Sequence, residues 1–384
     1  MTFGDLLLIV LAGLGGPLLA LTPRLFVPLV IGEILAGAAL GNTGLGAVHP
    51  ANATTAFLGQ VGFAMLMLTA GMHLPLRDPR LFASLRRGAL LAGAVGVLAV
   101  PGGLAAAAIA GTSHAAIYAV VLASGSAAVL LPALAETGAG GHEVLSVVAQ
   151  VTIADVVTIV SVPIVLAPSR TAHALLGGVL VAGAAALLLL VARLLAGREW
   201  VARVRAESKR RHWALDLRIA LLVLFFLAWL AKRSGTSVLI AGFGAGVTVA
   251  LVGGPKRLST QIRGVADGFF VPLYFVVLGA QLDLGGLFEH PQMIALAAAL
   301  VALNVLIHLI AARAGRVSPG AGLAASAQLG VPAAVASLGL AGGVISSEVA
   351  TAIVAASIVS LAVCTAGVQR LLARAPVATP TLAR

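Results

Sequence analysis

Apolar stretches of about 20 residues, the length that an α-helix needs to cross a lipid bilayer, follow one another along almost the whole chain. The polar connectors between them are short, and none is long enough to form a soluble domain. The mean hydropathy is +1.10, and only 10% of the 384 residues are charged. These values place the chain in lipid, so we predict an all-α polytopic membrane protein.

The pattern predicts thirteen membrane spans, with ends defined to within about two to four residues. They are residues 5–21, 24–41, 54–72, 88–110, 114–135, 143–167, 172–196, 214–231, 236–253, 264–282, 291–312, 318–341 and 345–372.

Basic residues test this number of spans because they gather on the cytoplasmic side of membrane helices. With the N-terminus outside, all but three of the 24 basic residues fall in cytoplasmic segments. The exceptions are Arg170, Lys232 and Arg233. An even number of spans would break this alternation, so we predict an outside N-terminus and a cytoplasmic C-terminus. The formal charge of +11 is large, but it is the placement of the basic residues beside the spans that orients the helices, so we expect no nucleic-acid partner.

The longest polar connector, residues 197–213, follows the seventh span. Six spans precede the seventh and six follow it, which is the layout of two inverted six-helix repeats joined by a linker helix. We therefore predict one transmembrane domain over residues 1–372. Repeat 1 covers about 5–167, the linker helix about 172–196 and repeat 2 about 214–372, and a short cytoplasmic tail covers 373–384.

Spans five and twelve occupy corresponding places in the two halves, and both contain helix-breaking residues. Span five contains Ala123-Ser-Gly-Ser-Ala-Ala128 and then Pro132, and span twelve contains Ser326-Ala-Gln-Leu-Gly-Val-Pro332. Small residues of this kind also permit close helix packing. Matched breaks in the two halves, however, are typical of a transporter's binding site, where broken helices expose their backbone dipoles.

The span from Val144 to Leu166 carries one carboxylate, Asp155, near its middle. An acid at that depth costs roughly 2.5–3.5 kcal/mol, so it indicates a function; the structural alternative is an acid hydrogen-bonded to neighbouring hydroxyls. Burial favours a protonated carboxyl and a bound cation favours a carboxylate, so this one group can hold a proton or a cation in turn. Small or hydroxyl-bearing residues surround it in the sequence: Thr152, Ala154, Thr158 and Ser161.

Neutral oxygens near the predicted crossing come from Ser124, Ser126 and Gln328. Hard cations such as Na⁺ and K⁺ favour oxygen donors, so we include these residues with Asp155 and Thr152 in the predicted ion and proton site. Glu33 is the other acid within a span. It either assists the cation path or makes a structural hydrogen bond.

Asn304 and His308 are four residues apart and therefore share one face of a helix. His308 is either a neutral core histidine or a pH sensor. The glycines of Gly242-Phe-Gly-Ala-Gly246 lie inside an apolar span without a preceding strand, so they predict helix packing and no dinucleotide site. The basic cluster between Arg198 and Arg211 either anchors the topology or contacts anionic lipid.

Three stretches carry a family pattern. They are Val27-Pro-Leu-Val-Ile-Gly-Glu-Ile-Leu-Ala-Gly-Ala-Ala-Leu-Gly-Asn42, the span-three stretch Gly59–Met72, and Pro272-Leu-Tyr-Phe-Val-Val-Leu-Gly279. In this order and spacing, the chain resembles the monovalent cation:proton antiporter-2 family, which contains the Kef-type and bacterial sodium/proton exchangers. The resemblance covers essentially the whole chain. It implies a homodimer in the bacterial inner membrane, in which a six-helix core with two crossed discontinuous helices moves against a dimerisation domain.

The resemblance also assigns site residues. The family's essential aspartate matches Asp155, but the preceding acid or asparagine of that pair is Ala154 here. The family's membrane-embedded lysine aligns with Asn304, and its Arg-Gly-Glu motif appears as Leu329-Gly-Val331. These departures leave the ion and the stoichiometry open. With no second acid and no lysine, the simplest exchange is one cation per proton, which is electroneutral.

We therefore predict a secondary active transporter that exchanges Na⁺ or K⁺ for protons, with no cofactor, no resident metal and no enzymatic activity. One alternative is a sodium-coupled organic-anion symporter, which would need a more polar solute cavity. Another is an intramembrane enzyme. An aspartyl protease needs two aspartates buried in the membrane on separate helices, and only Asp155 is deeply placed in this sequence. A polyprenyl transferase needs an Asp-rich cluster that holds magnesium at a membrane face, and Asp267 and Asp283 do not form such a cluster.

Overall fold

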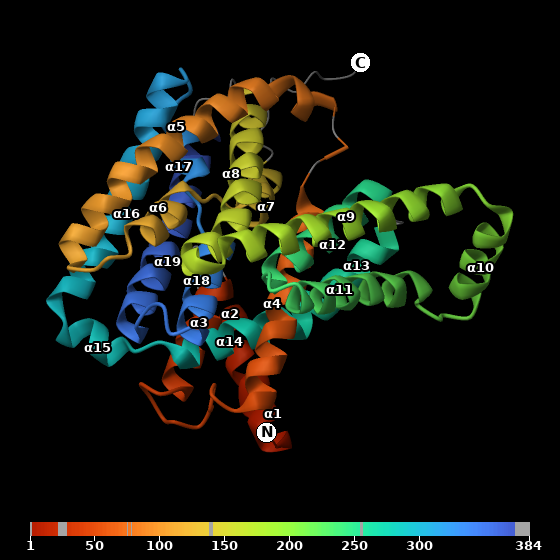
Figure 1. Ribbon diagram of the computed structural model, residues 1–384, viewed down its shortest axis with the longest axis horizontal. Helices are drawn as coiled ribbons and strands as arrows, with labels where there is room; N and C mark the ends of the chain where they lie inside the picture. Colours follow the sequence, from red (N-terminus) through yellow and green to blue (C-terminus); the bar gives the residue numbers. More distant parts are fainter. Residues whose placement is uncertain are drawn as a thin grey trace, which may run out of the picture.

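The computed structural model of this chain describes residues 2–21, 29–74, 76–77, 79–137, 141–253 and 256–372. Within these ranges the chain forms helices and no strand (Figure 1). Arg24, Pro28 of the first family motif and the predicted tail at 373–384 lie outside the described residues.

The helices pack into two bundles, and each bundle draws on both halves of the chain. The scaffold bundle contains α1 (Phe3–Gly13), α2 (Gly15–Ala20), α3 (Leu29–Leu40), α4 (Ala53–His73), α11 (Leu215–Arg233), α12 (Val238–Val252), α13 (Lys256–Val265), the π-helical turn η2 (Ala266–Phe270) and α14 (Val271–Gln281). The core bundle contains α5 (Pro79–Ala110), α6 (Ala115–Ala123), α7 (Ala127–Thr137), α8 (His142–Leu166), α15 (Leu284–Glu289), α16 (Pro291–Ala314), α17 (Pro319–Ala325), α18 (Gly330–Ala341) and α19 (Ser347–Leu372).

Both halves contribute in the same order, scaffold helices first and core helices second. The connection between the halves runs through the 3₁₀ turn η1 (Pro168–Arg170), α9 (Thr171–Ala196) and α10 (Glu199–Arg210). In Figure 1, α9 and α11 extend away from the bundles with α10 at their far end. The division into two inverted repeats around a linker helix stays a prediction.

Ten helical segments of the described chain are long and apolar enough to cross a membrane, or eleven if the bent pair α10 and α11 counts as one. The axes of that pair differ by 110°. Two shorter apolar helices, α3 and α12, occupy the second and ninth predicted spans. The described part of each predicted span thus contains helix, and the number of helices that cross the membrane stays a prediction.

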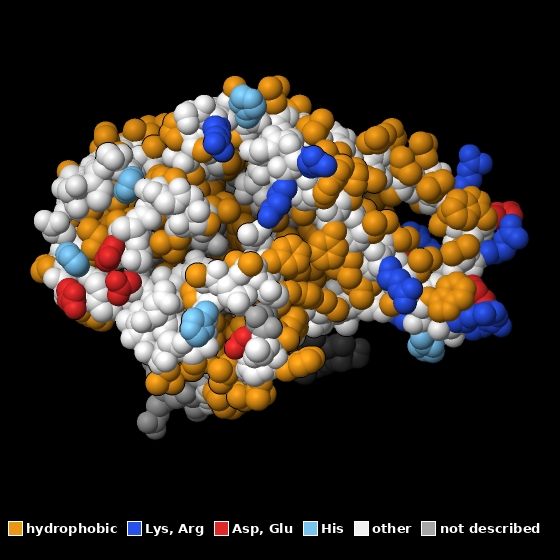
Figure 2. Space-filling view, turned by 60° about the horizontal axis from the view of Figure 1, so that its bottom comes forward, with side chains coloured by type: hydrophobic (Ala, Val, Ile, Leu, Met, Phe, Trp, Pro, Cys, Tyr) orange, Lys and Arg blue, Asp and Glu red, His pale blue; other side chains and the backbone are white. Residues whose placement is uncertain are grey.

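The polar connector at 197–213 folds into an amphipathic helix, α10, which the sequence did not predict. Its Glu207 accepts hydrogen bonds from Arg210 and Arg211, and Arg205 lies 3.5 Å from Asp216 of α11. Figure 2 shows basic side chains gathered at this end of the molecule, next to a largely hydrophobic surface. Basic residues on an amphipathic helix are typical of the lipid headgroup region.

Glycines let α4 and α12 pack backbone to backbone. A Cβ on Gly71 would lie 2.5 Å from the carbonyl oxygen of Phe243, and one on Gly242 would lie 2.7 Å from that of Ala64. This confirms the packing interpretation of Gly242–Gly246. The close contact holds α4 in place along the boundary between the two bundles.

Candidate ion site at the crossing of the interrupted helices

Two spans are interrupted where the sequence predicts breaks. Helices α6 and α7 are separated by Ser124-Gly125-Ser126, and α17 and α18 are separated by residues 326–329. Pro332 sits in the first turn of α18, where the missing N–H of proline has no intrahelical partner to lose. A Cβ on Gly125 would lie 2.9 Å from Val151 Cγ1, so this break packs tightly against α8.

Asp155 lies on α8 beside the break between α6 and α7. Its side chain is 9% exposed, and its Oδ2 accepts a hydrogen bond of 2.9 Å from the backbone N–H of Ala127. Ala127 is the first residue of α7, and the first N–H groups of a helix have no intrahelical acceptor. The helix terminus therefore supplies one donor and the positive end of a dipole to the carboxyl group.

A cavity of about 20 Å³ adjoins Asp155 and is large enough for about one water molecule or a small ion. It is lined by Ser126 and Asp155 from the core bundle and by the start of α18 at residues 329–331. From the scaffold bundle, α4 contributes Leu66, Met67 and Ala70. Asp155 thus lies at the boundary between the bundles, close to both breaks.

Gln328 and Asn304 connect the two breaks. Gln328 Nε2 donates to the carbonyl oxygen of Val121, at 2.7 Å, and to Asn304 Oδ1, at 3.1 Å. Asn304 Nδ2 in turn donates to the carbonyl oxygen of Ser326, at 2.9 Å. The last carbonyls of a helix have no intrahelical donor, so these neutral amides satisfy the ends of α6 and α17.

Gln328, predicted as an ion ligand, therefore does not line the cavity beside Asp155. Ser124 is also turned away, because its Oγ donates to the carbonyl oxygen of Val121 at 2.7 Å. Ser126 does line the cavity. Thr152, one turn before Asp155, is buried, and its Oγ1 has no hydrogen-bond partner among the described residues.

The remaining candidates lie further from the cavity or make local bonds. The carbonyl oxygen of Ala154 accepts from Thr158 Oγ1 at 2.6 Å, and Ser161 Oγ donates to Val157 on the more exposed side of α8. Ser161 therefore does not surround the carboxyl group as its place in the sequence suggests. His308 is buried, and its Nδ1 lies 2.9 Å from the carbonyl oxygen of Asn304 on the same helix.

Glu33 belongs to the scaffold bundle. It is 5% exposed on α3, which packs against α1, α2 and α14, and its Oε2 has no hydrogen-bond partner among the described residues. A Cβ on Gly16 of α2 would lie 3.2 Å from Glu33 Oε1. Glu33 is not among the residues that line the cavity at Asp155.

Sequence reasoning missed the contribution of α4 to this cavity. Its stretch from Gly59 to Met72 entered only as part of a family pattern, and Leu66, Met67 and Ala70 carry no polar group. The sequence also did not predict the backbone N–H of Ala127 as a donor to Asp155, because the position of such a donor depends on the residue at which the helix restarts.

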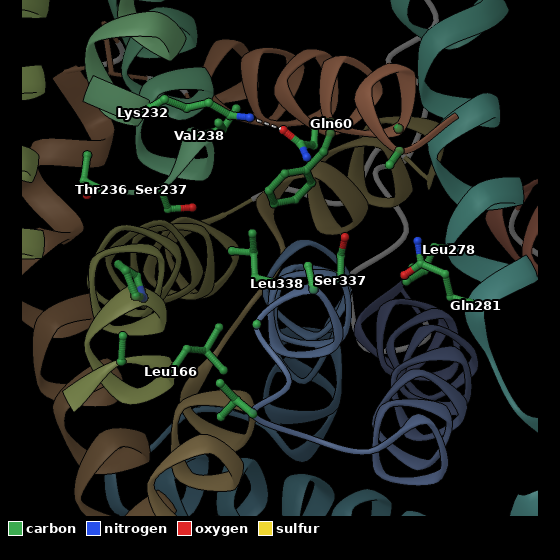
Figure 3. A pocket seen from close by; sticks show the side chains of 18 of the residues that line it. Gln60, Leu166, Lys232, Thr236, Ser237, Val238, Leu278, Gln281, Ser337 and Leu338 are labelled. Atoms are coloured by element: carbon green, nitrogen blue, oxygen red, sulfur yellow. Dashed lines mark hydrogen bonds between the residues drawn. The ribbon is translucent and has the colours of Figure 1, made fainter. Parts of the chain in front are cut away.

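A larger cavity of about 670 Å³, which we call the vestibule, lies along the same boundary (Figure 3). Its walls come from α4, α11, α12 and α14 on the scaffold side and from the end of α8, η1 and α18 on the core side. Phe63 and Tyr274 line it with their ring centroids 5.2 Å apart, and Tyr274 donates its hydroxyl to the carbonyl oxygen of Ala333 at 3.0 Å. Phe63 and Met67 are one turn apart on α4, so the vestibule comes close to the cavity at Asp155.

Comparison with known proteins shows which family the chain matches. The family model described as "sodium/hydrogen exchanger, transmembrane" matches residues 6–374. The chain belongs to this family. The match confirms the resemblance seen in the sequence, and it is a match to a transporter family.

Curated relatives of this chain include potassium and sodium transport proteins. The glutathione-regulated potassium-efflux system protein KefC of Cronobacter sakazakii is 28% identical over 280 residues, which cover 70% of this chain and 43% of KefC. The Na⁺/H⁺ antiporter of Enterococcus hirae is 24% identical over 292 residues, 74% of each chain. The chain spans about half the length of KefC and of the "Putative Na(+)/H(+) antiporter YjbQ" of Bacillus subtilis, of which 47% is covered.

Among solved structures, the sodium proton antiporter MjNhaP1 of Methanocaldococcus jannaschii matches with a TM-score of 0.64. The match covers 96% of this chain and 98% of the other, at 16% sequence identity. It confirms the predicted fold class, an all-α membrane protein with the sodium/proton antiporter-like fold.

Proposed function

We propose that this chain exchanges a monovalent cation, Na⁺ or K⁺, for protons, and that Asp155 is the group that both ions occupy in turn. The observation that carries this proposal is the position of Asp155: a buried carboxyl at the boundary between two bundles, beside both helix breaks, next to a cavity for a single small ion. The names of the relatives, which include Na⁺/H⁺ and potassium-efflux proteins, support the same class of cargo.

The chemistry follows from competition at one site. In the protonated state the carboxyl is neutral and suits its apolar surroundings. A cation that enters the cavity stabilises the carboxylate and displaces the proton, with the N–H of Ala127 holding Oδ2 in place. Relative movement of the two bundles would expose this cavity to one side of the membrane at a time.

One cation per proton is the stoichiometry that this site supports. Ala154, Asn304 and Gln328 are neutral, and among the described residues that line the cavity Asp155 is the one carboxylate. Exchange of one monovalent cation for one proton moves no net charge, so we propose electroneutral antiport.

We further propose that the chain acts as a homodimer in a bacterial inner membrane, with the N-terminus outside and the C-terminus in the cytoplasm. The distribution of basic residues supports the orientation. Exposed apolar side chains on α1, among them Phe3, Leu7 and Leu11, provide a surface for lipid or for a second copy.

The test is dissipation of a pH gradient in proteoliposomes. Pulses of Na⁺, K⁺ or Li⁺ should each be compared with choline for the native protein, Asp155→Asn and Asp216→Asn. Asp216 is the matched control, because this acid lies at the α10–α11 end of the molecule, paired with Arg205. We expect a cation response from the native chain and the control and none from Asp155→Asn. A native protein without any response contradicts antiport, and an active Asp155→Asn contradicts the site.

A further inference from the structure

The vestibule has an unexpected charge for a chamber beside a cation site. Among the described residues that line it, Arg170 and Lys232 are the charged ones, and neither aspartate nor glutamate is present. Both are among the three basic residues that the topology prediction places outside. Two positive charges at the mouth of a low-dielectric chamber repel cations and attract anions.

Neither charge is neutralised by a carboxylate in the described part of the chain. Lys232 Nζ donates to Gln60 Oε1, which ties α11 to α4 but leaves the ammonium charge in place (Figure 3). Arg170 ends the η1 turn and forms no ion pair with a described residue. Lys232 is exposed, and so is Arg170.

The rest of the vestibule is mainly apolar. Phe63, Leu166, Val277, Leu278 and Leu338 contribute hydrocarbon walls. Neutral polar groups such as Ser337 and Gln281 lie between them (Figure 3). A volume of about 670 Å³ falls within the range of about 300–1,000 Å³ that is usual for small-molecule sites.

We propose that the vestibule binds an amphipathic organic anion, with its charged head at Lys232 and Arg170 and its hydrocarbon tail along the apolar walls. The ligand contacts α4, α11 and α14 of the scaffold bundle together with η1 and α18 of the core bundle, so it holds the bundles in one arrangement and inhibits exchange. It is an inhibitor and not a cargo, because the cavity of about 20 Å³ at Asp155 is far too small for it. This site goes beyond the proposed exchange activity.

Calorimetric titration of the purified protein in nanodiscs of zwitterionic lipid tests the proposal directly. The probe is decanesulfonate, whose charge does not depend on pH, and empty nanodiscs correct for its partition into lipid. Decyltrimethylammonium has a chain of the same length with the opposite charge, and butanesulfonate has the same head with a short chain. We expect saturable binding of decanesulfonate, with both controls at least about tenfold weaker.

Variants locate the site. Lys232→Gln and Arg170→Gln should each weaken decanesulfonate binding by about tenfold, because each removes a charge-assisted contact. Arg233→Gln is the matched control: Arg233 is adjacent to Lys232 in the chain, lies outside the vestibule lining and stacks over Trp229 at 5.9 Å. It should bind within about twofold of the native chain. Thermal unfolding of each variant identifies any that fail to fold. If Lys232→Gln fails to fold, Arg170→Gln still tests the proposal, because Arg170 does not make the hydrogen bond to Gln60 that Lys232 makes.

Several results would overturn the proposal. They are no saturable binding of decanesulfonate, equal binding of decyltrimethylammonium, equal binding of butanesulfonate, or equal losses in Lys232→Gln and Arg233→Gln. Because calorimetry requires no transport, failure of this inference is distinguishable from failure of the antiport proposal. Decanesulfonate added to the vestibule side should also slow the cation response in proteoliposomes.

Discussion

Asp155 combines three properties that seldom occur together in a membrane span: burial, a backbone donor at 2.9 Å and an adjoining cavity of about 20 Å³. The surrounding polar side chains do not share its role equally. Ser126 faces the cavity, whereas Ser124, Asn304 and Gln328 satisfy backbone carbonyls at the helix breaks. The ion site is therefore smaller than the set of polar residues around it.

Replacement of Gln328 tests this division of roles. Gln328→Leu leaves Asn304 Oδ1 unpaired, at a cost of about 1–3 kcal/mol for a buried acceptor left unsatisfied, whereas the carbonyl oxygen of Val121 keeps Ser124 Oγ as a donor. We expect a clear loss in the free energy of unfolding, measured by thermal or chemical unfolding in detergent. Ser161→Ala is the control, since its hydroxyl bonds only within α8, and it should unfold like the native chain. Equal stability of Gln328→Leu and the native chain would contradict the role of Gln328 in joining the breaks.

The sequence predicted a buried Asp155 but not the contacts of the residues around it, and the role of Asp155 stays a prediction. An acid in the middle of an apolar span is costly to place in the membrane, so its presence there indicates a function. Whether Gln328 faces an ion or a carbonyl depends on side-chain direction at a break, where helical periodicity no longer applies. Periodicity did place Asn304 and His308 on one face of α16, and both side chains are buried there.

One hydrogen bond joins α14 of the scaffold bundle to the interrupted helix α18 of the core bundle. Tyr274, which lines the vestibule, joins the bundles through its hydroxyl and the carbonyl oxygen of Ala333. Tyr274→Phe removes this bond and keeps the ring against Phe63. A hydrogen bond of about 0.5–1.5 kcal/mol shifts an opening equilibrium about two- to tenfold.

The expected result is faster labelling of Ala70→Cys, at a position that lines the cavity beside Asp155, by a small charged methanethiosulfonate. The buried Cys364 is first replaced by serine. Tyr118→Phe is the control, because its hydroxyl bonds to Thr112 within the core bundle at 3.0 Å, and it should leave the labelling rate unchanged. Identical labelling rates with and without the Tyr274→Phe substitution would mean that this bond does not restrict access.

Helices α4 and α12 pack closely through glycines, and a substitution of Gly71 tests this contact. Gly71→Ala places a Cβ 2.5 Å from the carbonyl oxygen of Phe243, so the helices must separate and the protein should lose about 1–3 kcal/mol of unfolding free energy. Gly183→Ala, in α9, meets no atom within 4 Å and should be neutral or slightly stabilising. The free energies of unfolding of the two variants should therefore differ, and equal stabilities would contradict the close packing of α4 and α12.

Element positions were largely predictable because membrane spans have a strong signal in length and apolarity. Both breaks followed from Ser-Gly-Ser and Gly-Val-Pro sequences, whose residues are poor in helix interiors. The start of α5 at Pro79, nine residues before the predicted span, and the π-helical turn at Ala266–Phe270 were not predictable. Helix outside the membrane carries little apolar signal, and a π-helical turn has no periodicity of its own.

At the scale of the whole molecule, two bundles meet along a boundary that contains both the cavity at Asp155 and the vestibule. The sequence predicted the halves, but which helices share a bundle depends on long-range packing that no local pattern encodes. With Asp155 as the one carboxylate among the described residues that line the cavity, and with a neutral Asn304, a transport cycle should carry no net charge. Solid-supported membrane recordings should therefore detect no transport current when a cation gradient drives exchange, and a transient current that the native chain gives and Asp155→Asn does not would contradict the one-to-one stoichiometry.

If one carboxyl group holds either a proton or a cation, binding of the cation must release the proton, and proton release measures this competition most directly. NaCl or KCl is added to purified, weakly buffered protein across a range of pH, and the released protons are counted against choline chloride. The native chain should release up to about one proton per chain at a pH below the midpoint of the Asp155 titration, where the carboxyl is protonated until the cation binds, and Asp155→Asn should release none. Equal release by both proteins, or no release by the native chain with either cation at any pH, would contradict the account.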